Sequence, residues 1–435
     1  MRPEARIAAT IELLDEWLTS LKMSRQPADI LVSNFFRARR YAGSKDRRAI
    51  TGSFYAILRN FASLAHQWDR EALTGRQLVL SYYYETDTES LDLFNIESDY
   101  APQNLTAEEK KALEDNSGKD KDEHITLNCP EVYATAFKKR FGDDFKTEIE
   151  ALNVPAMLSV RVNPLKGDRH QIFGKLVGQG IRLKRTEYSP YGFIFEEKTP
   201  LGNLDLYKTG VIEVQDEAAQ IASMLIDAQE EDTVIDLCAG AGGKSLLAAA
   251  IGPKKANFIA FDIDNRRLND LNKRAERAGV NIHAIKLPYT GTRRGSKLTP
   301  YVEKADQVIV DVPCSGTGTW RRNPDLRVRM EAEDLNRLTA QQTGLLKEGS
   351  QLVRPGGYLF YMTCSLLPQE NEDIVDQFLA KNTDFTRIDA RDRLNEIEPS
   401  IDLKCPYSLN EDDILLSPNS HGTDGFYISI LQRLA

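Results

Sequence analysis

The sequence predicts an α/β protein in which a doubly wound, mostly parallel sheet follows a small α+β element and an N-terminal helical bundle. Three observations carry this prediction. Apolar residues recur at steps of three and four over residues 5–22, short apolar runs alternate with helical sequence beyond Val211, and 435 residues exceed the size at which one core usually closes. We expect three domains, at residues 1–124, 125–205 and 206–435.

Composition is that of a soluble globular protein. Hydrophobic residues make up 41% of the chain and charged residues 28%, and no run approaches the ~18 apolar residues that a membrane-spanning helix needs. The N-terminus lacks the apolar core of a secretory signal. We therefore expect a cytoplasmic protein without membrane contact and, by default, a monomer.

The cysteines indicate neither a disulfide framework nor a metal site. They are five in number and none pairs at CxxC spacing, so no zinc site and no metal is expected. Each has to be interpreted by its own surroundings: Cys129, Cys238, Cys314, Cys364 and Cys405.

The net charge of −9 argues at first against a nucleic-acid partner, because phosphate contacts need Lys and Arg. Its distribution reverses that argument. Residues 1–60 hold 11 basic against 6 acidic side chains, residues 67–125 hold 6 against 15, and residues 126–200 hold 12 against 9. The acidity of the first half lies in one segment, which we expect to face solvent.

The N-terminal residues are expected to form a helical bundle. The helix over residues 5–22 is followed by helical sequence around residues 29–32 and 46–60. Thr106 has the position of a helix cap, and the polar run after that helix, ending near His124, is expected to be a linker.

The next segment reads as a compact α+β element. We expect a helix over 131–141, a strand over 156–163, a helix over 170–178 and a strand over 181–185. Its basic residues include Arg161 and Lys166, which we assign to RNA contact; packing against the following domain is the alternative.

Strict alternation of strands and helices begins after Val211. Apolar runs are followed each time by helical or loop sequence, which is typical of a doubly wound sheet. The predicted strands cover residues 233–237, 258–261, 282–287, 307–312 and 358–362.

A glycine-rich turn joins the first of these strands to a helix. Such a turn lets the backbone bend sharply and approach a ligand closely, and its spacing fits neither a phosphate-cradling loop nor a dinucleotide fingerprint. An ordinary βα turn is the alternative. The expected cofactor-binding residues here are Cys238, Ala239, Gly240, Ala241, Gly242, Gly243 and Lys244.

Asp262 ends the next strand, at the sheet edge where a carboxylate accepts hydrogen bonds from ribose hydroxyls. Its other interpretation is a helix cap, a role for which Asp264 is better placed. Lys244 could pair with a carboxylate such as that of methionine. S-Adenosylmethionine satisfies both ends of this site.

Cys314 and Cys364 follow the fourth and fifth strands of the sheet. Ends of neighbouring parallel strands lie side by side, so the two thiols can converge on one substrate. A buried structural cysteine is the usual alternative for each. Carbon 5 of cytosine attacks a sulfonium methyl group only after a thiolate has added at carbon 6, which gives a methyltransferase a use for a thiol.

In these residues the sequence resembles the RsmB/Sun/Nop family of RNA cytosine-5 methyltransferases. It is most similar to the bacterial RsmB-type members, which act on 16S ribosomal RNA. The resemblance implies a Rossmann-like S-adenosylmethionine-dependent catalytic domain. The matching segments are Val214–Ala219, the glycine turn to Lys244, Asp262, Arg277–Gly279, Asp311–Gly316, Arg322–Asp325, Thr363–Ser365 and Asp424–Tyr427.

The resemblance also implies roles for individual residues. Cys364 would be the nucleophile, Cys314 would promote release of the methylated RNA, and Asp311 would lie where cofactor and target base meet. The chain departs from the family at Pro288, where an acidic residue usually reaches the adenine amino group. Backbone atoms or another side chain would have to replace that contact.

RNA contacts are expected close to the catalytic cysteines and in the N-terminal half. Arg321 and Arg322, with Arg327 and Arg329 nearby, follow the Cys314 loop and could hold phosphates. The 125–205 segment resembles the RNA-recognition-like element of the family, and the helical N-terminus resembles its NusB-like domain through Lys45–Arg48 and Tyr55–Arg59.

Three functions remain open on the sequence alone. The first is formation of 5-methylcytosine in small-subunit ribosomal RNA through a covalent Cys364 adduct. The second is a different methyl transfer: the same reaction on transfer RNA, or methylation of another substrate by the same cofactor fold. The paired cysteines argue against another substrate, because sulfur, oxygen and nitrogen targets need no covalent activation. The third is a non-catalytic RNA-binding or ribosome-assembly factor with the same fold, which retention of both cysteines, Lys244, Asp262 and Asp311 argues against.

Overall fold

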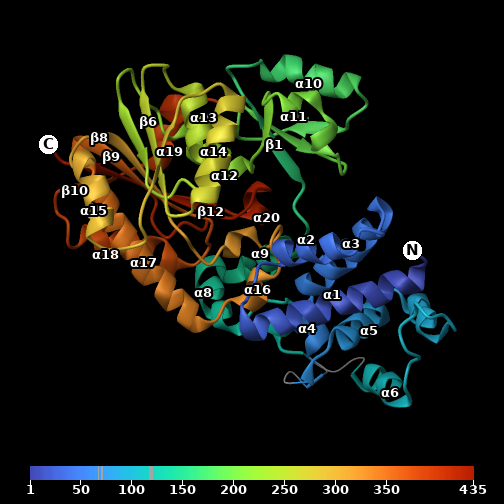
Figure 1. The fold of residues 1–435 in the computed structure, drawn as a ribbon. Helices are drawn as coiled ribbons and strands as arrows, with labels where there is room; N and C mark the ends of the chain where they lie inside the picture. The colour runs from blue at the N-terminus through green and yellow to red at the C-terminus, as the bar shows by residue number, and fades with distance from the viewer. Residues whose placement is uncertain (67, 70–71, 117–120) are drawn as a thin grey trace. The chain divides into compact units, whose positions relative to one another are not determined.

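The computed structural model describes residues 1–435 except 67, 70–71 and 117–120. The described chain forms two compact units (Figure 1). The helical unit contains residues 1–139, 143–154 and 320–332, and the α/β unit contains residues 140–142, 155–319 and 333–435. In neither unit is a described helix both long and apolar enough to cross a membrane.

The helical unit is built around α1 (Pro3–Met23), which buries the apolar face predicted from its spacing. Trp17 is fully buried and packs edge-on against Phe54 and Phe61, with ring centroids 6.4 and 5.5 Å away. Such aromatic pairs fill the centre of the bundle. The other α-helices are α2 (Ala28–Ala38), α3 (Ser44–Arg59), α4 (Phe61–Ala65), α5 (Gly75–Thr86), α6 (Ala107–Asn116), α7 (Glu123–Thr126), α8 (Glu131–Phe141, whose last two residues belong to the α/β unit), α9 (Phe145–Asn153) and α16 (Leu326–Arg329).

Thr106 caps α6, as predicted. Its Oγ1 accepts a hydrogen bond from Glu109 N at 3.1 Å, while Glu109 accepts one from Thr106 N at 3.0 Å, which is a capping box. The acidic segment does not face solvent throughout, because Phe94 and Leu113 are buried in the helical core. Part of the expected linker, residues 117–120, lies outside the described residues.

A segment from the second half of the chain completes the helical unit. Trp320 is fully buried between Tyr133 and Phe137, and the guanidinium of Arg327 lies 4.6 Å from its ring centroid. Arg327 donates hydrogen bonds to the carbonyl oxygens of Leu152 at 2.9 Å and of Arg59 at 3.1 Å. Residues 320–332 are therefore part of this core.

The α/β unit contains a small antiparallel sheet with strand order β2-β3-β1-β4. The sequence predicted two of these strands and the helix α10 (Arg169–Gly178), whereas β3 and β4 were missed. β4 pairs with β1 although it lies beyond the expected boundary at residue 205, and the expected boundary at residue 124 separates α8 and α9 from the helical unit to which they largely belong. The strands are β1 (Leu158–Val162), β2 (Leu183–Arg185), β3 (Gly192–Phe195) and β4 (Ile212–Val214), and α11 (Asp205–Lys208) precedes β4.

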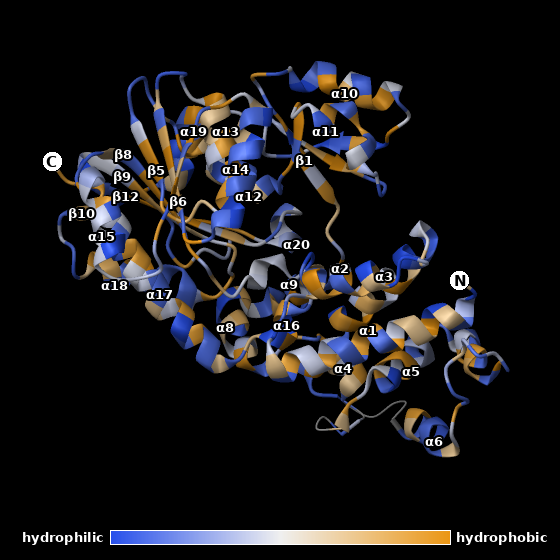
Figure 2. Ribbon diagram, viewed as in Figure 1, coloured by the Kyte–Doolittle hydropathy of each residue, from blue (hydrophilic) through white to orange (hydrophobic). Residues whose placement is uncertain are grey.

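The large sheet has the order β10-β12-β9-β8-β5-β6-β7, with β11 paired to β12. All five predicted strands are present and mutually parallel, and Figure 2 shows this central part of the sheet as hydrophobic. The three C-terminal strands pair antiparallel and were not predicted. The strands are β5 (Thr233–Asp236), β6 (Asn257–Asp262), β7 (His283–Lys286), β8 (Ala305–Asp311), β9 (Val353–Thr363), β10 (Phe385–Ile388), β11 (Ile414–Leu416) and β12 (Phe426–Arg433).

Helices connect and cover these strands. Figure 1 shows α12, α13 and α14 side by side against the sheet, and Figure 2 shows α14 as mostly hydrophilic outside its buried leucines. This is the doubly wound α/β arrangement that the alternation predicted. The helices are α12 (Glu217–Met224), α13 (Gly243–Ile251), α14 (Asn265–Ala278), α15 (Thr292–Leu298), α17 (Ala332–Ser350, largely in the α/β unit), α18 (Glu372–Leu379), α19 (Ala390–Ile397) and α20 (Pro418–His421).

Candidate active site

The glycine turn between β5 and α13 adopts backbone conformations that favour glycine. Gly240 has a φ of 56° and Gly242 a φ of 79°, both in the left-handed region that other residues rarely adopt. A Cβ at Gly242 would also lie 2.7 Å from Leu271. The atoms nearest to a Cβ built at Gly240 or Gly243 are Arg267 Nη1 at 3.9 Å and Gln215 Nε2 at 4.0 Å, so neither position is crowded.

Asp262 joins this turn to the neighbouring strand. Its carboxylate accepts hydrogen bonds from Gly240 N at 2.8 Å and from Asp264 N at 2.7 Å. The cap of α14 is Asp264, which accepts from Arg266 N at 2.8 Å. Asp262 therefore does not cap that helix, and a carboxylate has lone pairs left for hydroxyl donors.

Lys244, in the first turn of α13, pairs with Asp311 at the end of β8. Its Nζ lies 2.5 Å from Asp311 Oδ2 and 4.8 Å from the ring centroid of Phe426. Burial alone would lower the pKa of Lys244, but the charge and hydrogen bond of Asp311 outweigh it and the pKa is raised. The ammonium group stays charged, and its partner within the protein is Asp311.

Asp236, at the end of β5, lies beneath the glycine turn and is almost fully buried. Its carboxyl group accepts hydrogen bonds from Ser245 Oγ and from Cys238 N. Burial raises the pKa of Asp236 to about 7, against the hydrogen bond from Ser245. This carboxyl group therefore titrates near neutral pH.

The two expected catalytic thiols lie side by side. Asp311 and Met362 are paired in the parallel ladder of β8 and β9, so the loops that begin after these strands start at the same edge. Cys314 Sγ and Cys364 Sγ are 3.3 Å apart. The hydrogen bond to Cys364, together with burial, raises the pKa of Cys314 well above the usual range of a thiol. Cys314 therefore keeps its proton, and either sulfur can be the donor in the contact between the two thiols.

A buried polar network lies directly behind these thiols. Glu370 is fully buried and accepts hydrogen bonds from Ser315, the residue after Cys314. In the sequence, Glu370 carried no signal beyond its place in a polar run after the second cysteine, which is why its contact with the first cysteine loop could not be predicted.

The assignment of Arg161 to RNA contact is wrong, because its side chain is only 1% exposed in β1. It lies beside Glu213, which accepts hydrogen bonds from Arg274 at 3.1 Å and from Arg277 at 2.6 Å. Arg274 in turn donates to Ala241 O at 2.7 Å in the glycine turn. This charged cluster therefore supports the glycine turn.

Lys166 is exposed, and its ammonium group donates to the carbonyl oxygens of Thr209 at 2.8 Å and of Arg277 at the end of α14. Asn163, fully buried, donates to Ala278 O at 2.7 Å. Together they cap the C-terminus of α14, where unpaired carbonyl groups need donors. The 125–205 segment therefore packs against the following domain, which was the alternative to RNA contact.

The arginines after the Cys314 loop belong to the helical unit. Arg321 and Arg322 are partly exposed, so their assignment stays a prediction. Arg327 is buried in hydrogen bonds to backbone carbonyls, and Arg329 pairs with Asp325 at 2.7 Å. An RNA contact through Arg327 is excluded by its burial.

Pro288 stands where the family resemblance implies an acidic residue. Its carbonyl oxygen accepts a hydrogen bond from Arg294 at 3.1 Å, and Arg294 forms a bidentate ion pair with Glu348 of α17. The backbone at this position is thus engaged by the protein itself. Among the residues that the structure describes, no group of three or more His, Cys, Asp or Glu side chains could hold a metal ion.

Comparison with known proteins shows which family the chain is similar to. Residues 222–432 match the family model described as 16S rRNA methyltransferase RsmB/F, and residues 129–202 match the ferredoxin-like domain of RsmF/B-like methyltransferases. The ribosomal RNA small subunit methyltransferase B of Thermus thermophilus is 34% identical over 317 residues, which are 72% of this chain and 67% of that protein.

The first relatives are matched over less than two thirds of their own length. A relative from Bacillus subtilis is 28% identical over 285 residues, which are 64% of this chain but only 60% of that protein. Among solved structures, the crystal structure of PH0851 covers 100% of this chain and 99% of its own, with a TM-score of 0.77 and 23% sequence identity. At that identity the likeness concerns the fold, which extends over both units.

Proposed function

Because this chain belongs to the RsmB/F family of 16S rRNA methyltransferases, we propose that it transfers a methyl group from S-adenosylmethionine to carbon 5 of a cytosine in small-subunit ribosomal RNA. The observation that carries the proposal is the pair of thiols, Cys314 and Cys364, 3.3 Å apart at the ends of two adjacent parallel strands. Methylation of oxygen or nitrogen needs no such nucleophile, whereas methylation of this ring carbon does.

The residues around the glycine turn fit the cofactor. The glycine turn, with Gly240 and Gly242 at positive φ, lets a ligand approach the backbone closely, and Asp262 offers a carboxylate to ribose hydroxyls at the same edge. S-Adenosylmethionine supplies an activated methyl group on a sulfonium ion. We assign its binding to Cys238–Lys244, Asp262 and Asp311, with Lys244 holding Asp311 in place through their ion pair.

Cys364 is the proposed nucleophile. Its sulfur adds to carbon 6 of cytosine, and the electron pair of the ring double bond becomes available at carbon 5. Once carbon 5 carries the methyl group, its hydrogen leaves as a proton. The electrons of that bond restore the ring double bond, and the bond between carbon 6 and sulfur breaks to return the thiolate.

The electrostatics of the pair support a division of labour between the two thiols. The largest contribution to the raised pKa of Cys314 is its hydrogen bond to Cys364. When the Cys364 sulfur is bound to carbon 6, that contribution ends and the pKa of Cys314 falls. Cys314 can then lose its proton to solvent, and its thiolate accepts the proton from carbon 5 to release the product.

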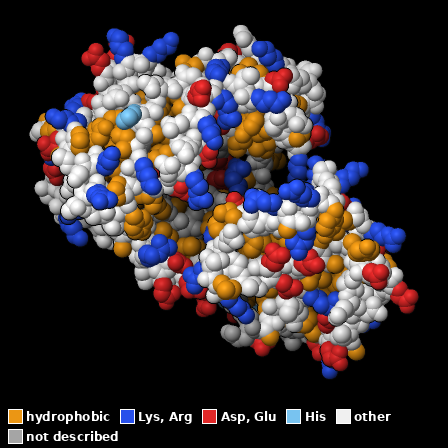
Figure 3. Space-filling view, in the orientation of Figure 1, with side chains coloured by type: hydrophobic (Ala, Val, Ile, Leu, Met, Phe, Trp, Pro, Cys, Tyr) orange, Lys and Arg blue, Asp and Glu red, His pale blue; other side chains and the backbone are white. Residues whose placement is uncertain are grey.

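Basic surface on the helical unit offers phosphate contacts. Figure 3 shows a row of Lys and Arg side chains over α2 and α3, which include the exposed Arg37 and Arg48. Arg40 and Lys45, between the two helices, are exposed as well. We propose that this row, together with Arg321 and Arg322, binds the RNA backbone, as a NusB-like role of the helical unit would require.

The test is incubation of the purified protein with radiolabelled S-adenosylmethionine and unmodified small-subunit ribosomal RNA, followed by nucleoside analysis and by a search for covalent protein–RNA adducts. We expect 5-methylcytosine with the natural protein, none with Cys364→Ala, and a trapped adduct with Cys314→Ala. Cys405→Ala, which removes a thiol far along the chain from both catalytic loops, is the matched control and should retain activity.

Other outcomes identify the alternatives. Methylation confined to transfer RNA would replace the ribosomal substrate. Cofactor binding without transfer to any RNA would indicate a binding or assembly factor, and full activity of Cys364→Ala would reject the nucleophile.

A further inference from the structure

Both cysteine loops are held by one buried group. Glu370 follows β9 and its two carboxyl oxygens accept three hydrogen bonds, from Ser315 N at 2.8 Å, from Ser315 Oγ, and from Gln342 Nε2 at 2.9 Å. Gln342, on α17, also donates to Pro313 O at 3.0 Å. The residues on either side of Cys314 are therefore fixed to the same carboxyl group.

The network continues into the Cys364 loop. Ser315 Oγ lies 3.3 Å from Ser365 Oγ, which lies 3.2 Å from Thr317 Oγ1. Thr317 Oγ1 accepts a hydrogen bond from Leu366 N at 2.9 Å, and Gly318 N donates to Cys364 O at 3.0 Å. Each cysteine is thus followed by a serine that belongs to the network behind the thiols.

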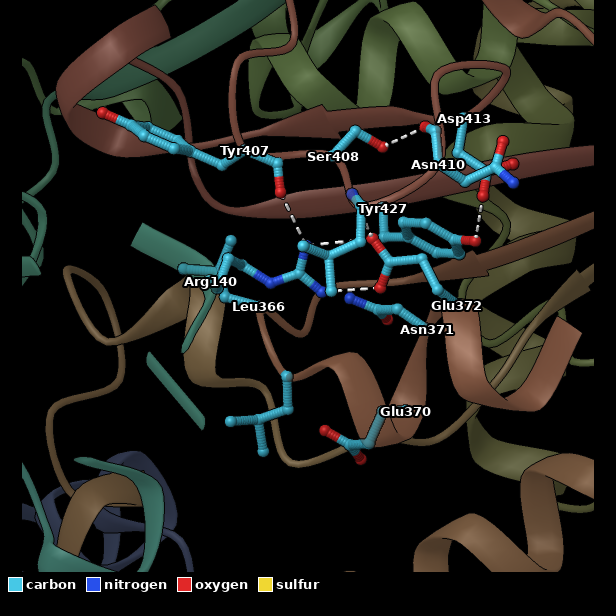
Figure 4. A network of polar contacts seen from close by, with 12 residues as sticks. Arg140, Leu366, Glu370, Asn371, Glu372, Tyr407, Ser408, Asn410, Asp413 and Tyr427 are labelled. Carbon is cyan, nitrogen blue, oxygen red and sulfur yellow. Dashed lines mark hydrogen bonds and ion pairs between the residues drawn. The ribbon is translucent and has the colours of Figure 1, made fainter. Parts of the chain in front are cut away.

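The neighbouring acid of the same loop serves a different purpose. Figure 4 shows Glu372 paired with Arg140 by two hydrogen bonds, of 2.9 and 2.6 Å, on the side of the loop away from Glu370. Arg140 also donates to Tyr407 O at 2.9 Å. Glu370 and Glu372 are both buried, but they have different partners. Glu370 binds the cysteine loops, whereas Glu372 binds Arg140.

We propose that Glu370 is a positioning residue for both thiols, joining the Cys314 and Cys364 loops and setting a negative charge behind Cys314. The proposal deepens the proposed function and rests on it for the catalytic meaning of the thiols. Fixing reacting groups in a productive geometry is worth large rate factors, so a misplaced sulfur costs turnover rather than substrate binding.

The negative charge of Glu370 has a second effect, which can be measured separately from positioning. Cys314 is faced by Cys364 and Glu370, whose charges both raise its pKa, and Tyr361 lies near enough to feel the charge of Cys314. Lys244, which pairs with Asp311, interacts electrostatically with Cys364. Removing the charge of Glu370 should therefore lower the pKa of Cys314, because one source of repulsion for its thiolate is lost.

The test measures the pH dependence of Cys314 alkylation by iodoacetamide, resolved by peptide mass spectrometry, on the full protein without RNA or cofactor. Glu370→Gln keeps the length of the side chain but not its charge, and we expect the alkylation midpoint of Cys314 to fall by about half a pH unit or more. Glu370→Asp keeps the charge but not the reach, and should leave the midpoint closer to that of the natural protein.

Activity assays are the second part of the test. Both variants should lose about tenfold or more in kcat for methyl transfer with the KM for RNA nearly unchanged, because positioning and not binding is impaired. Glu372→Gln is the matched control: it breaks the pair with Arg140 and lowers stability, but the Cys314 midpoint should not move. The alkylation result stands even if no RNA is methylated, so failure of the proposed function is recognised separately.

An unchanged midpoint in folded Glu370→Gln, or the same shift in Glu372→Gln, would overturn the proposal. If Glu370→Gln does not fold, Ser315→Ala tests the same connection, since it removes only the hydroxyl between Glu370 and Ser365. Diamide coupling of Cys314 to Cys364 should then slow by about threefold or more, and an unchanged coupling rate would reject the positioning role.

Discussion

The sulfur atoms of Cys314 and Cys364 lie 3.3 Å apart although 50 residues separate them in the chain. The distance follows from the sheet, because β8 and β9 are adjacent and parallel and each cysteine lies just beyond the end of one of them. In the proposed mechanism, a substrate carbon bound to one sulfur would therefore lie close to the other. The same proximity makes the pair sensitive to thiol oxidation.

Diamide should couple the two thiols and stop methyl transfer. It takes two hydrogens from two thiols to leave a disulfide, and the approach of the sulfurs makes this pair the favoured one. Dithiothreitol should restore activity, and peptide mapping should find Cys314 joined to Cys364. Cys405→Ser should react like the natural protein, whereas a linkage that persists in Cys314→Ser would contradict the prediction.

Asp236 should make stability fall as pH rises. Burial raises its pKa to about 7, whereas the unfolded chain has the ordinary value of about 3.9, so the native state holds the proton over this range and the unfolded state does not. The free energy of unfolding should decrease between about pH 4 and 7 relative to Asp236→Asn, and level off above. Urea unfolding at several pH values measures it.

Asp264→Asn is the contrasting variant for that series. Hydrogen bonds from the backbone and side chain of Arg266 lower the pKa of this half-buried cap, so its contribution is lost only as pH falls into the acid range. If the Asp236→Asn difference does not change between pH 5 and 7, Asp236 does not titrate there.

Arg161→Met should leave RNA binding unchanged. The Arg161 guanidinium is buried and its nitrogens have no hydrogen-bond partner among the described residues, so an apolar side chain of similar length can replace it at a cost of no more than about 1 kcal/mol. Filter binding at several salt concentrations should give the same slope as the natural protein. Arg40→Met, at the exposed basic row, should reduce the slope by about 0.7 to 0.9.

Glu213→Gln should be far more harmful than Arg161→Met. Glu213 accepts from Arg274 and Arg277, and removing its charge leaves these guanidinium groups without their acid, which typically costs about 3 to 5 kcal/mol for a buried pair. Thermal unfolding compares the two variants. Equal destabilisation would show that the arginines, rather than the acid, hold the cluster together.

Gly425→Ala should disturb the thiols from a distance along the chain. A Cβ at Gly425 would lie 2.6 Å from Gly318 Cα and 2.8 Å from the Leu366 side chain, which belong to the two cysteine loops. Overpacking of this kind costs about 1 to 3 kcal/mol, and methyl transfer should fall with it. Gly344→Ala in α17, where a Cβ meets nothing within 4 Å, should be neutral or slightly stabilising.

Local patterns in the sequence were enough for the parallel core and for the positions of the functional groups along it. The apolar runs predicted β5 to β9, and Asp262 and Asp311 lie at strand ends as predicted. Thr106 and Asp264 cap the helices for which they were suited, because capping depends on the next three residues only. The antiparallel strands β10 to β12 were missed, since nothing local indicates which strand they join.

What this sequence determined by itself is therefore the identity and order of the chemical groups: a glycine turn, acids at strand ends and two thiols after adjacent strands. Tertiary structure decided their partners. Lys244 pairs with Asp311, Glu370 reaches Ser315, and Arg161 is buried. Each of these contacts, and the burial of Arg161, depends on residues tens of positions away in the chain. The packing of one element against another, and not the local sequence, determines which polar groups are buried together.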